Sequence, residues 1–189
     1  MPKIRALATL LVTAAGAIIA EPKCPRLADA EPSALVSYLD GSMASQTPAC
    51  VEYAIGQLGE RRYGPAADTL IRHLGFRREP DFWEKGEDVV ELQHEWYPAA
   101  TALFQIGKPA LQPLIDLLGT ETPPVVRAKA LQTVVDICRD DFVSAVKLLR
   151  AAAAKQEDSA AKTRLLDAAG RAVQMCPRGL RPQCEDALR

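Results

Sequence analysis

Cysteines are the residues of this chain whose chemistry is easiest to infer from type and spacing. There are five of them: Cys24, Cys50, Cys138, Cys176 and Cys184. Cys176 and Cys184 flank the turn-rich segment PRGLRP. The turns allow the two ends of this segment to approach, so we predict that the two cysteines form a disulfide. Cys138 falls on an apolar helical face, which suits a free thiol that packs as a small hydrophobic group. By elimination we pair Cys24 with Cys50, and the absence of a Cys-x-x-Cys pair argues against a metal site.

Paired acids are a second group that could do chemistry. Asp140-Asp141 and Glu157-Asp158 could bind calcium or act in hydrolysis, but both pairs fall where helices are predicted to begin. Negative charge is favoured there by the unpaired amides and the helix dipole, so we interpret both pairs as helix caps. The chain has neither a Gly-x-Ser-x-Gly elbow nor a glycine-rich phosphate loop. We therefore predict no catalytic residues, no metal and no cofactor.

Aromatic residues concentrate between Phe76 and Tyr97. This stretch holds five of the ten aromatic residues, interleaved with arginines and acids. Aromatic and arginine side chains together are typical of binding hot spots, and long loops often carry function. The predicted binding residues are Arg77, Arg78, Phe82 and Trp83. The alternative is that the aromatics only fill space left by an irregular connection between helices.

Two internal repeats provide the elements that must position these residues. Residues 54–59 (AIGQLG) match residues 102–107 (ALFQIG), and residues 65–75 match residues 109–119. A weaker third copy begins near Ala130. Apolar residues recur at helical spacing in every copy, and each copy predicts a helix, a short turn and a second helix.

Proline, threonine and glycine mark the predicted ends of these helices. The predicted caps are Thr47 and Thr122, the predicted first-turn prolines are Pro48, Pro65, Pro98, Pro109 and Pro123, and the predicted stops are Gly75 and Gly119. A short helix over Pro32–Leu39 and a longer one after Asp158 are expected to close the two ends. No alternating β-branched run is present, so we predict an all-α chain.

The runs ALFQIGKPA (residues 102–110) and LIDLL (residues 114–118) resemble HEAT-like repeats of the PBS-lyase type. The resemblance covers rather more than half of the chain beyond residue 20. It implies an α-α superhelix of about three to four helix pairs, with repeats over 47–157, an insertion at 76–97, an N-terminal segment over 21–46 and a C-terminal capping helix and cysteine-containing tail over 158–189. The pattern encodes helix packing and carries no chemistry of its own.

Two enzymatic groups share this repeat type, and the chain departs from both. Some HEAT-like oxygenases hold iron through several His-Glu pairs, whereas this chain has only His94-Glu95, and its other histidine, His73, precedes Leu74. Another group attaches chromophores to cysteines of partner proteins inside the cell. An exported chain does not fit that activity.

Export is predicted from the N-terminus. Lys3 and Arg5 precede an apolar run from Ala6 to Ala20, which is typical of a signal peptide over residues 1–20 that is cleaved after Ala17 or Ala20. The run is too short for a membrane span, so we expect no stable membrane insertion after cleavage. The mature chain keeps 21 basic and 24 acidic residues, and a net charge of about −3 argues against a nucleic-acid partner.

Taken together, these patterns predict a non-catalytic protein-interaction module in the periplasm or outside the cell. Stacked helix pairs leave an extended surface that suits another polypeptide. The alternative is a structural or assembly accessory of an envelope enzyme complex, and an enzyme is the third possibility.

Overall fold

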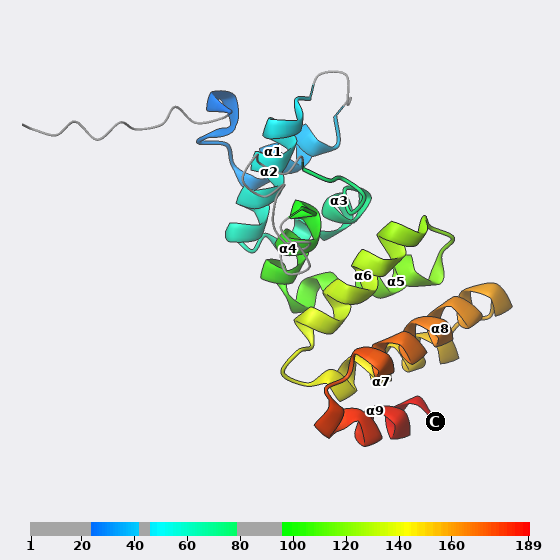
Figure 1. Ribbon diagram of the computed structural model, residues 1–189. Helices are drawn as coiled ribbons and strands as arrows, with labels where there is room; N and C mark the ends of the chain where they lie inside the picture. The colour runs from blue at the N-terminus through cyan, green and yellow to red at the C-terminus, as the bar shows by residue number, and fades with distance from the viewer. Residues whose placement is uncertain (1–23, 42–45, 79–95) are drawn as a thin grey trace, which may run out of the picture.

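The computed structural model describes residues 24–41, 46–78 and 96–189. Within these ranges the chain forms nine α-helices and no β-strand, which confirms the all-α prediction (Figure 1). The helices are α1 Pro32–Leu39, α2 Pro48–Glu60, α3 Ala67–Arg72, α4 Pro98–Ile106, α5 Leu111–Gly119, α6 Pro124–Ile137, α7 Phe142–Ala154, α8 Ser159–Met175 and α9 Arg181–Leu188. The predicted signal peptide and residues 79–95 of the insertion lie outside the described residues.

Side-chain caps begin three of the helices, as the sequence predicts. Thr47 Oγ1 accepts from the Cys50 amide of α2 at 3.4 Å, and the Asp141 carboxylate accepts from the Ser144 amide of α7 at 3.2 Å. The Asp158 carboxylate accepts from two amides of α8, at 3.0 and 3.1 Å. Hydrogen bonds from Ser144 lower the pKa of Asp141, and the two α8 amides lower that of Asp158. The capping interpretation of these acids is therefore confirmed.

Three predicted helix openings are wrong in detail. Pro65 and Pro109 lie in the 3-10 turns η3 (Gly64–Ala66) and η6 (Lys108–Ala110), and the α-helices follow these turns. Thr122 does not cap α6, because Pro123 is the N-cap and Pro124 is the first helical residue. The ring of Pro124 keeps Pro123 out of the helical region, at φ −53° and ψ 143°, so the helix starts one residue later than predicted.

From α1 to α6 the order of packing follows the order of the chain. The first helices of successive repeats stack, α2 on α4 and α4 on α6, while α3 packs on α4 and α5. Beyond α6 the pattern changes, because α8 packs on α5, and α7 lies chiefly against α8 and α9. Figure 1 shows the helices succeeding one another from α1 at one end of the molecule to α9 at the other.

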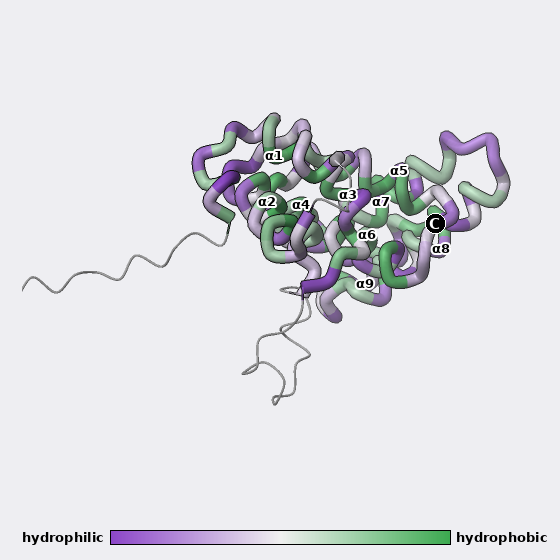
Figure 2. Tube along the Cα trace, turned by 90° about the horizontal axis from the view of Figure 1, so that it is seen from above, coloured by the Kyte–Doolittle hydropathy of each residue, from purple (hydrophilic) through white to green (hydrophobic). Residues whose placement is uncertain are grey.

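One hydrophobic core connects these helices, from Leu35 in α1 to Cys184 in α9. Its largest fully buried side chains are all Leu, Ile or Val. Hydrophobic and hydrophilic residues alternate along the helices in Figure 2, as expected for helices with one buried stripe. The described aromatic residues are half-buried, and Phe76 and Tyr97 pack against the edge of the core.

A close contact between the first two repeats is made at Gly59. A Cβ atom added there would lie 2.7 Å from Ala102 Cα and 2.8 Å from Ala102 Cβ, so α2 and α4 approach as closely as a glycine and an alanine allow. Gly107 aligns with Gly59 in the repeats, but its structural role is to end a helix. Its φ of 77° and ψ of −137° end α4, in a conformation that only glycine adopts readily.

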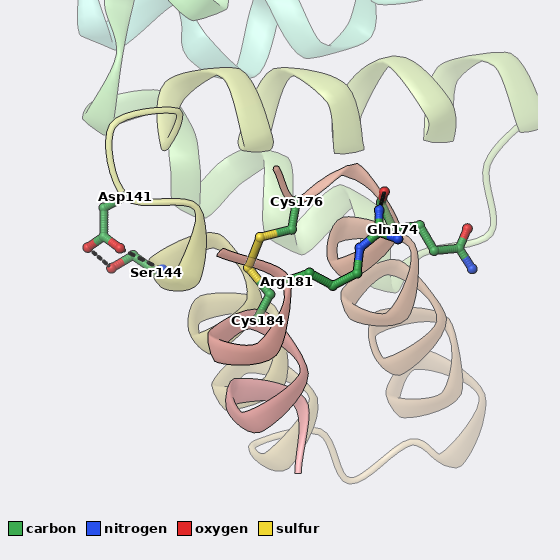
Figure 3. The surroundings of a disulfide bond; sticks show 6 residues. All are labelled: Asp141, Ser144, Gln174, Cys176, Arg181 and Cys184. Atoms are coloured by element: carbon green, nitrogen blue, oxygen red, sulfur yellow. Dashed lines mark hydrogen bonds between the residues drawn. A yellow bond between two sulfur atoms is a disulfide. The ribbon is translucent and has the colours of Figure 1, made fainter. Parts of the chain in front are cut away.

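Both predicted disulfides are present in the structure. Cys24 and Cys50 have a Cα separation of 5.5 Å, and Cys176 and Cys184 one of 6.7 Å, while Cys138 is free. Figure 3 shows the second bond joining the end of α8 to α9. Helix α9 itself was not predicted from the sequence, which indicated only a cysteine-containing tail there. The two disulfides indicate an oxidising, exported environment.

Among the described residues, none of the helices has both the length and the apolar character that crossing a membrane would require.

The close approach of α2 and α4 predicts opposite effects for two substitutions in the same helix. Gly59→Ala should lower the free energy of unfolding by about 1 to 3 kcal/mol, because its Cβ would collide with the α4 backbone. Gly56→Ala should raise it by about 0.5 to 1 kcal/mol, because a Cβ there meets nothing within 4 Å and alanine favours the helix. Urea unfolding of both variants measures the difference. Equal effects of the two would contradict the close contact.

Removing either disulfide should destabilise the protein, and more so for the bond that closes the longer loop. Replacing Cys24 and Cys50 together by alanine should cost about 3.5 kcal/mol, and replacing Cys176 and Cys184 about 2.5 kcal/mol, from the chain-entropy relation. Chemical unfolding under non-reducing conditions provides the comparison. Peptide mapping without reductant is the control, and a bond from Cys138 to any other cysteine would contradict this pairing.

Candidate functional site

A groove of about 610 Å³ runs between α2 and α4, and we call it the α2–α4 groove. From α2 it is lined by Ala49, Glu52, Tyr53, Gly56, Gln57 and Glu60. From α4 it is lined by Pro98, Thr101, Ala102 and Gln105, and Arg78 completes the lining. The α2 residues recur three or four positions apart, so they form one face of the helix. The opposite face of α2 contributes Val51, Ile55 and Leu58 to the core.

Gly56 gives the groove its free space. It lies in the middle of α2, half-buried, and a Cβ atom built there would meet nothing within 4 Å. The α2 backbone is therefore bare at Gly56, on the turn between Glu52 and Glu60. A ligand could approach α2 more closely at this turn than at any position that carries a side chain.

The ends of the aromatic insertion adjoin this groove. The Arg78 amide donates to the Trp96 carbonyl at 3.0 Å, and the guanidinium of Arg77 lies over the Trp96 ring, 4.5 Å from its centroid. Of the four predicted binding residues, the structure thus places Arg78 in the groove and Arg77 against Trp96. Phe82 and Trp83 lie outside the described residues, so their binding role stays a prediction.

A second, smaller groove of about 280 Å³ lies between α4 and α6. It is lined by Ala100, Thr101, Phe104, Thr133, Asp136 and Arg139. Thr101 borders both grooves, and the Arg139 guanidinium lies 5.4 Å from the centre of the Phe104 ring. The grooves therefore follow each other across the face formed by α2, α4 and α6.

Sequence reasoning missed most of these lining residues. The predicted binding residues are aromatic and arginine residues of the insertion, whereas the groove is lined mainly by the polar faces of two repeat helices. A signal was available, because Glu52, Gly56 and Glu60 recur every four residues opposite the apolar stripe of the same helix. Their meeting with α4 could not be read from that spacing.

Cys138 and His73 are described residues that bear on catalytic and metal chemistry. Burial, followed by the nearby Asp141, raises the pKa of the Cys138 thiol, while Lys108 opposes the shift, so this cysteine is not an activated nucleophile at neutral pH. No group of three His, Cys, Asp or Glu side chains in the described ranges could hold a metal ion. His73 Nε2 lies 3.2 Å from the Leu39 carbonyl, a contact between α3 and the end of α1.

Comparison with known proteins assigns no family, since no family model matches the chain and neither a curated protein nor a solved structure does. Its function has to be inferred from its own residues.

The contact between Arg77 and Trp96 predicts how the edge of the groove responds to mutation. Trp96→Ala should lower the free energy of unfolding by about 2 kcal/mol, less than a fully buried aromatic would, because this ring is half-buried. Trp96→Phe should cost less than about 1 kcal/mol, because it keeps a ring under Arg77 and removes the indole Nε1, which is buried without a hydrogen-bond partner in the described structure. Urea titration of both variants measures these costs, and an unchanged Trp96→Ala protein would contradict the contact.

Proposed function

We propose that the protein is an exported, non-catalytic HEAT-like repeat protein that binds a partner protein through the α2–α4 groove. The observation that carries this proposal is the groove itself, open, about 610 Å³ in volume and formed by two well-packed helices. Concave sites with a few placed polar groups are usual places for ligands to bind, and grooves also accept peptide segments. The proposal includes the signal peptide over residues 1–20 and release into the periplasm or the medium.

The arrangement of the repeats supports a superhelical scaffold. Helices α2 and α3 form the first pair, and α4 and α5 the second, each joined through a 3-10 turn that contains a proline. Successive first helices pack on one another, which is how stacked repeats build a continuous core and an extended surface. The third pair, α6 and α7, departs from regular stacking because α8 takes the place beside α5.

The composition of the groove supports a polypeptide partner rather than an apolar small molecule. Its walls combine carboxylates, amides and a hydroxyl with the ring of Tyr53, so they offer both hydrogen bonds and apolar contact. Protein-binding surfaces have this mixed character. Because α2 and α4 are held together at Gly59 and Ala102, little ordering of the protein is needed when a partner binds.

A pair of glycine variants tests the proposal without disturbing the core. Gly56→Arg should fill the groove, whereas Gly170→Arg adds the same side chain to α8, which does not line the groove, and neither Cβ would meet any atom within 4 Å. Both proteins should therefore fold with similar stability. We expect Gly56→Arg to weaken capture of the partner from envelope extract by at least about tenfold, equivalent to about 1.4 kcal/mol, and Gly170→Arg to leave it unchanged.

Capture is measured by quantitative mass spectrometry on equal amounts of immobilised wild-type and variant protein, with thermal melts as the folding control. Normal capture by Gly56→Arg would exclude the groove as the binding site. A wild-type protein that enriches no partner over a reduced and unfolded sample of the same chain would contradict the interaction function itself.

A further inference from the structure

We infer that the occupant of the α2–α4 groove is an extended, basic polypeptide segment with two Lys or Arg side chains four residues apart. This inference rests on the proposed function and adds the chemistry of the partner. Its basis is the position of two carboxylates on α2, Glu52 and Glu60, on either side of the bare turn at Gly56.

Neither carboxylate is neutralised within the described structure. Glu52 is half-buried and forms no hydrogen bond or ion pair there, and the exposed Glu60 only accepts a hydrogen bond from the Gln57 amide at 2.8 Å. Arg78 is the one cation among the described lining residues, so the lining keeps an excess of negative charge. A half-buried carboxylate without a partner gains more from an incoming cation than a fully solvated one does.

The spacing of the two carboxylates selects the conformation of the ligand. They are eight residues apart on α2, which corresponds to about 12 Å along the helix axis. An extended chain rises about 3.3 Å per residue, so residues i and i+4 are about 13 Å apart and their side chains point to the same side. Residues i and i+3 would direct their side chains to opposite sides.

The groove also offers contacts for the backbone of such a segment. Gly56 leaves room for close approach between the two carboxylates. The exposed Gln105 amide on the α4 wall makes no hydrogen bond within the described structure, and it can both donate to and accept from a peptide group. Side-chain pairs at the ends and a backbone contact between them suit a strand-like ligand that runs along α2.

The net charge of the groove also affects how a partner approaches it. Its described lining holds two carboxylates and one guanidinium, that of Arg78. The excess of negative charge in the described lining favours the approach of a basic partner and should make association depend on salt.

Synthetic peptides test the inference directly. The probe is a fluorescein-labelled, ten-residue Ser/Thr/Gly peptide with lysines at positions i and i+4, and the comparison peptides carry lysines at i and i+3 or glutamates at i and i+4. Fluorescence anisotropy with the disulfide-bonded mature protein should show the tightest binding for the i, i+4 lysine peptide. That binding should weaken at raised ionic strength.

Charge-neutral variants identify the groups involved. Glu52→Gln should weaken binding of this peptide by about five- to tenfold, since it removes one charge-assisted contact. Glu60→Gln should weaken it by about two- to fivefold, because Glu60 is exposed and an exposed ion pair contributes less. Glu185→Gln is the matched control, because it removes the same charge from an exposed position on α9 and should leave the dissociation constant unchanged. Gly56→Arg, which brings its own cation into the groove, should abolish binding.

Three results would overturn the inference. The first is that the i, i+4 lysine peptide does not bind at concentrations up to about 1 mM. The second is that the glutamate peptide or free spermidine binds as tightly as this lysine peptide. The third is that Glu52→Gln and Glu60→Gln bind it as tightly as Glu185→Gln does. If Gly56→Arg loses the natural partner while both glutamine variants keep it, the groove is still the binding site and only the basic character of the partner is wrong. Failure of the inference is thus distinguished from failure of the proposed function.

Discussion

The contact between Gly59 of α2 and Ala102 of α4 is the constraint on which the first half of the molecule depends. With no Cβ at Gly59, the two helices approach until the backbone of α4 occupies the space of a side chain. That approach aligns the first two repeats, continues the core from Val51 and Ile55 to Leu103, and leaves the polar faces of both helices beside each other. The close approach of α2 and α4 at Gly59 and Ala102 therefore positions both the core between these helices and the α2–α4 groove.

Because several helices are short, the stability of this molecule depends on packing between helices and on its two disulfides. Helices α3, α4 and α5 have six to nine residues, too few for stability in isolation. The most deeply buried side chains are aliphatic, and the described aromatics remain at the edges. Each end of the chain of helices is held by a disulfide, with Cys24 fixing the N-terminal segment to α2 and Cys184 fixing α9 to the end of α8.

Equivalent positions in the two clear repeats have acquired different physical roles. Gly59 is a close-packing residue inside α2, which continues to Glu60, whereas Gly107 ends α4 through a positive φ. The last part of the chain departs further, because α8 rather than α7 packs beside α5. The repeat pattern thus describes which helices form, and each contact between them is decided by the side chains that meet there.

Local features determined from the sequence alone were the all-α class, the caps at Thr47, Asp141 and Asp158, and both disulfide pairs. Each depends on residues close together along the chain or on a count of cysteines, so spacing and type suffice. The start of α6 is also set locally, by Pro124, although the prediction placed it one residue too early. Only the structure showed helix α9 and the groove. The groove joins residues more than forty positions apart, and its width is set by how closely two backbones approach at one glycine, which no periodicity within a single helix encodes.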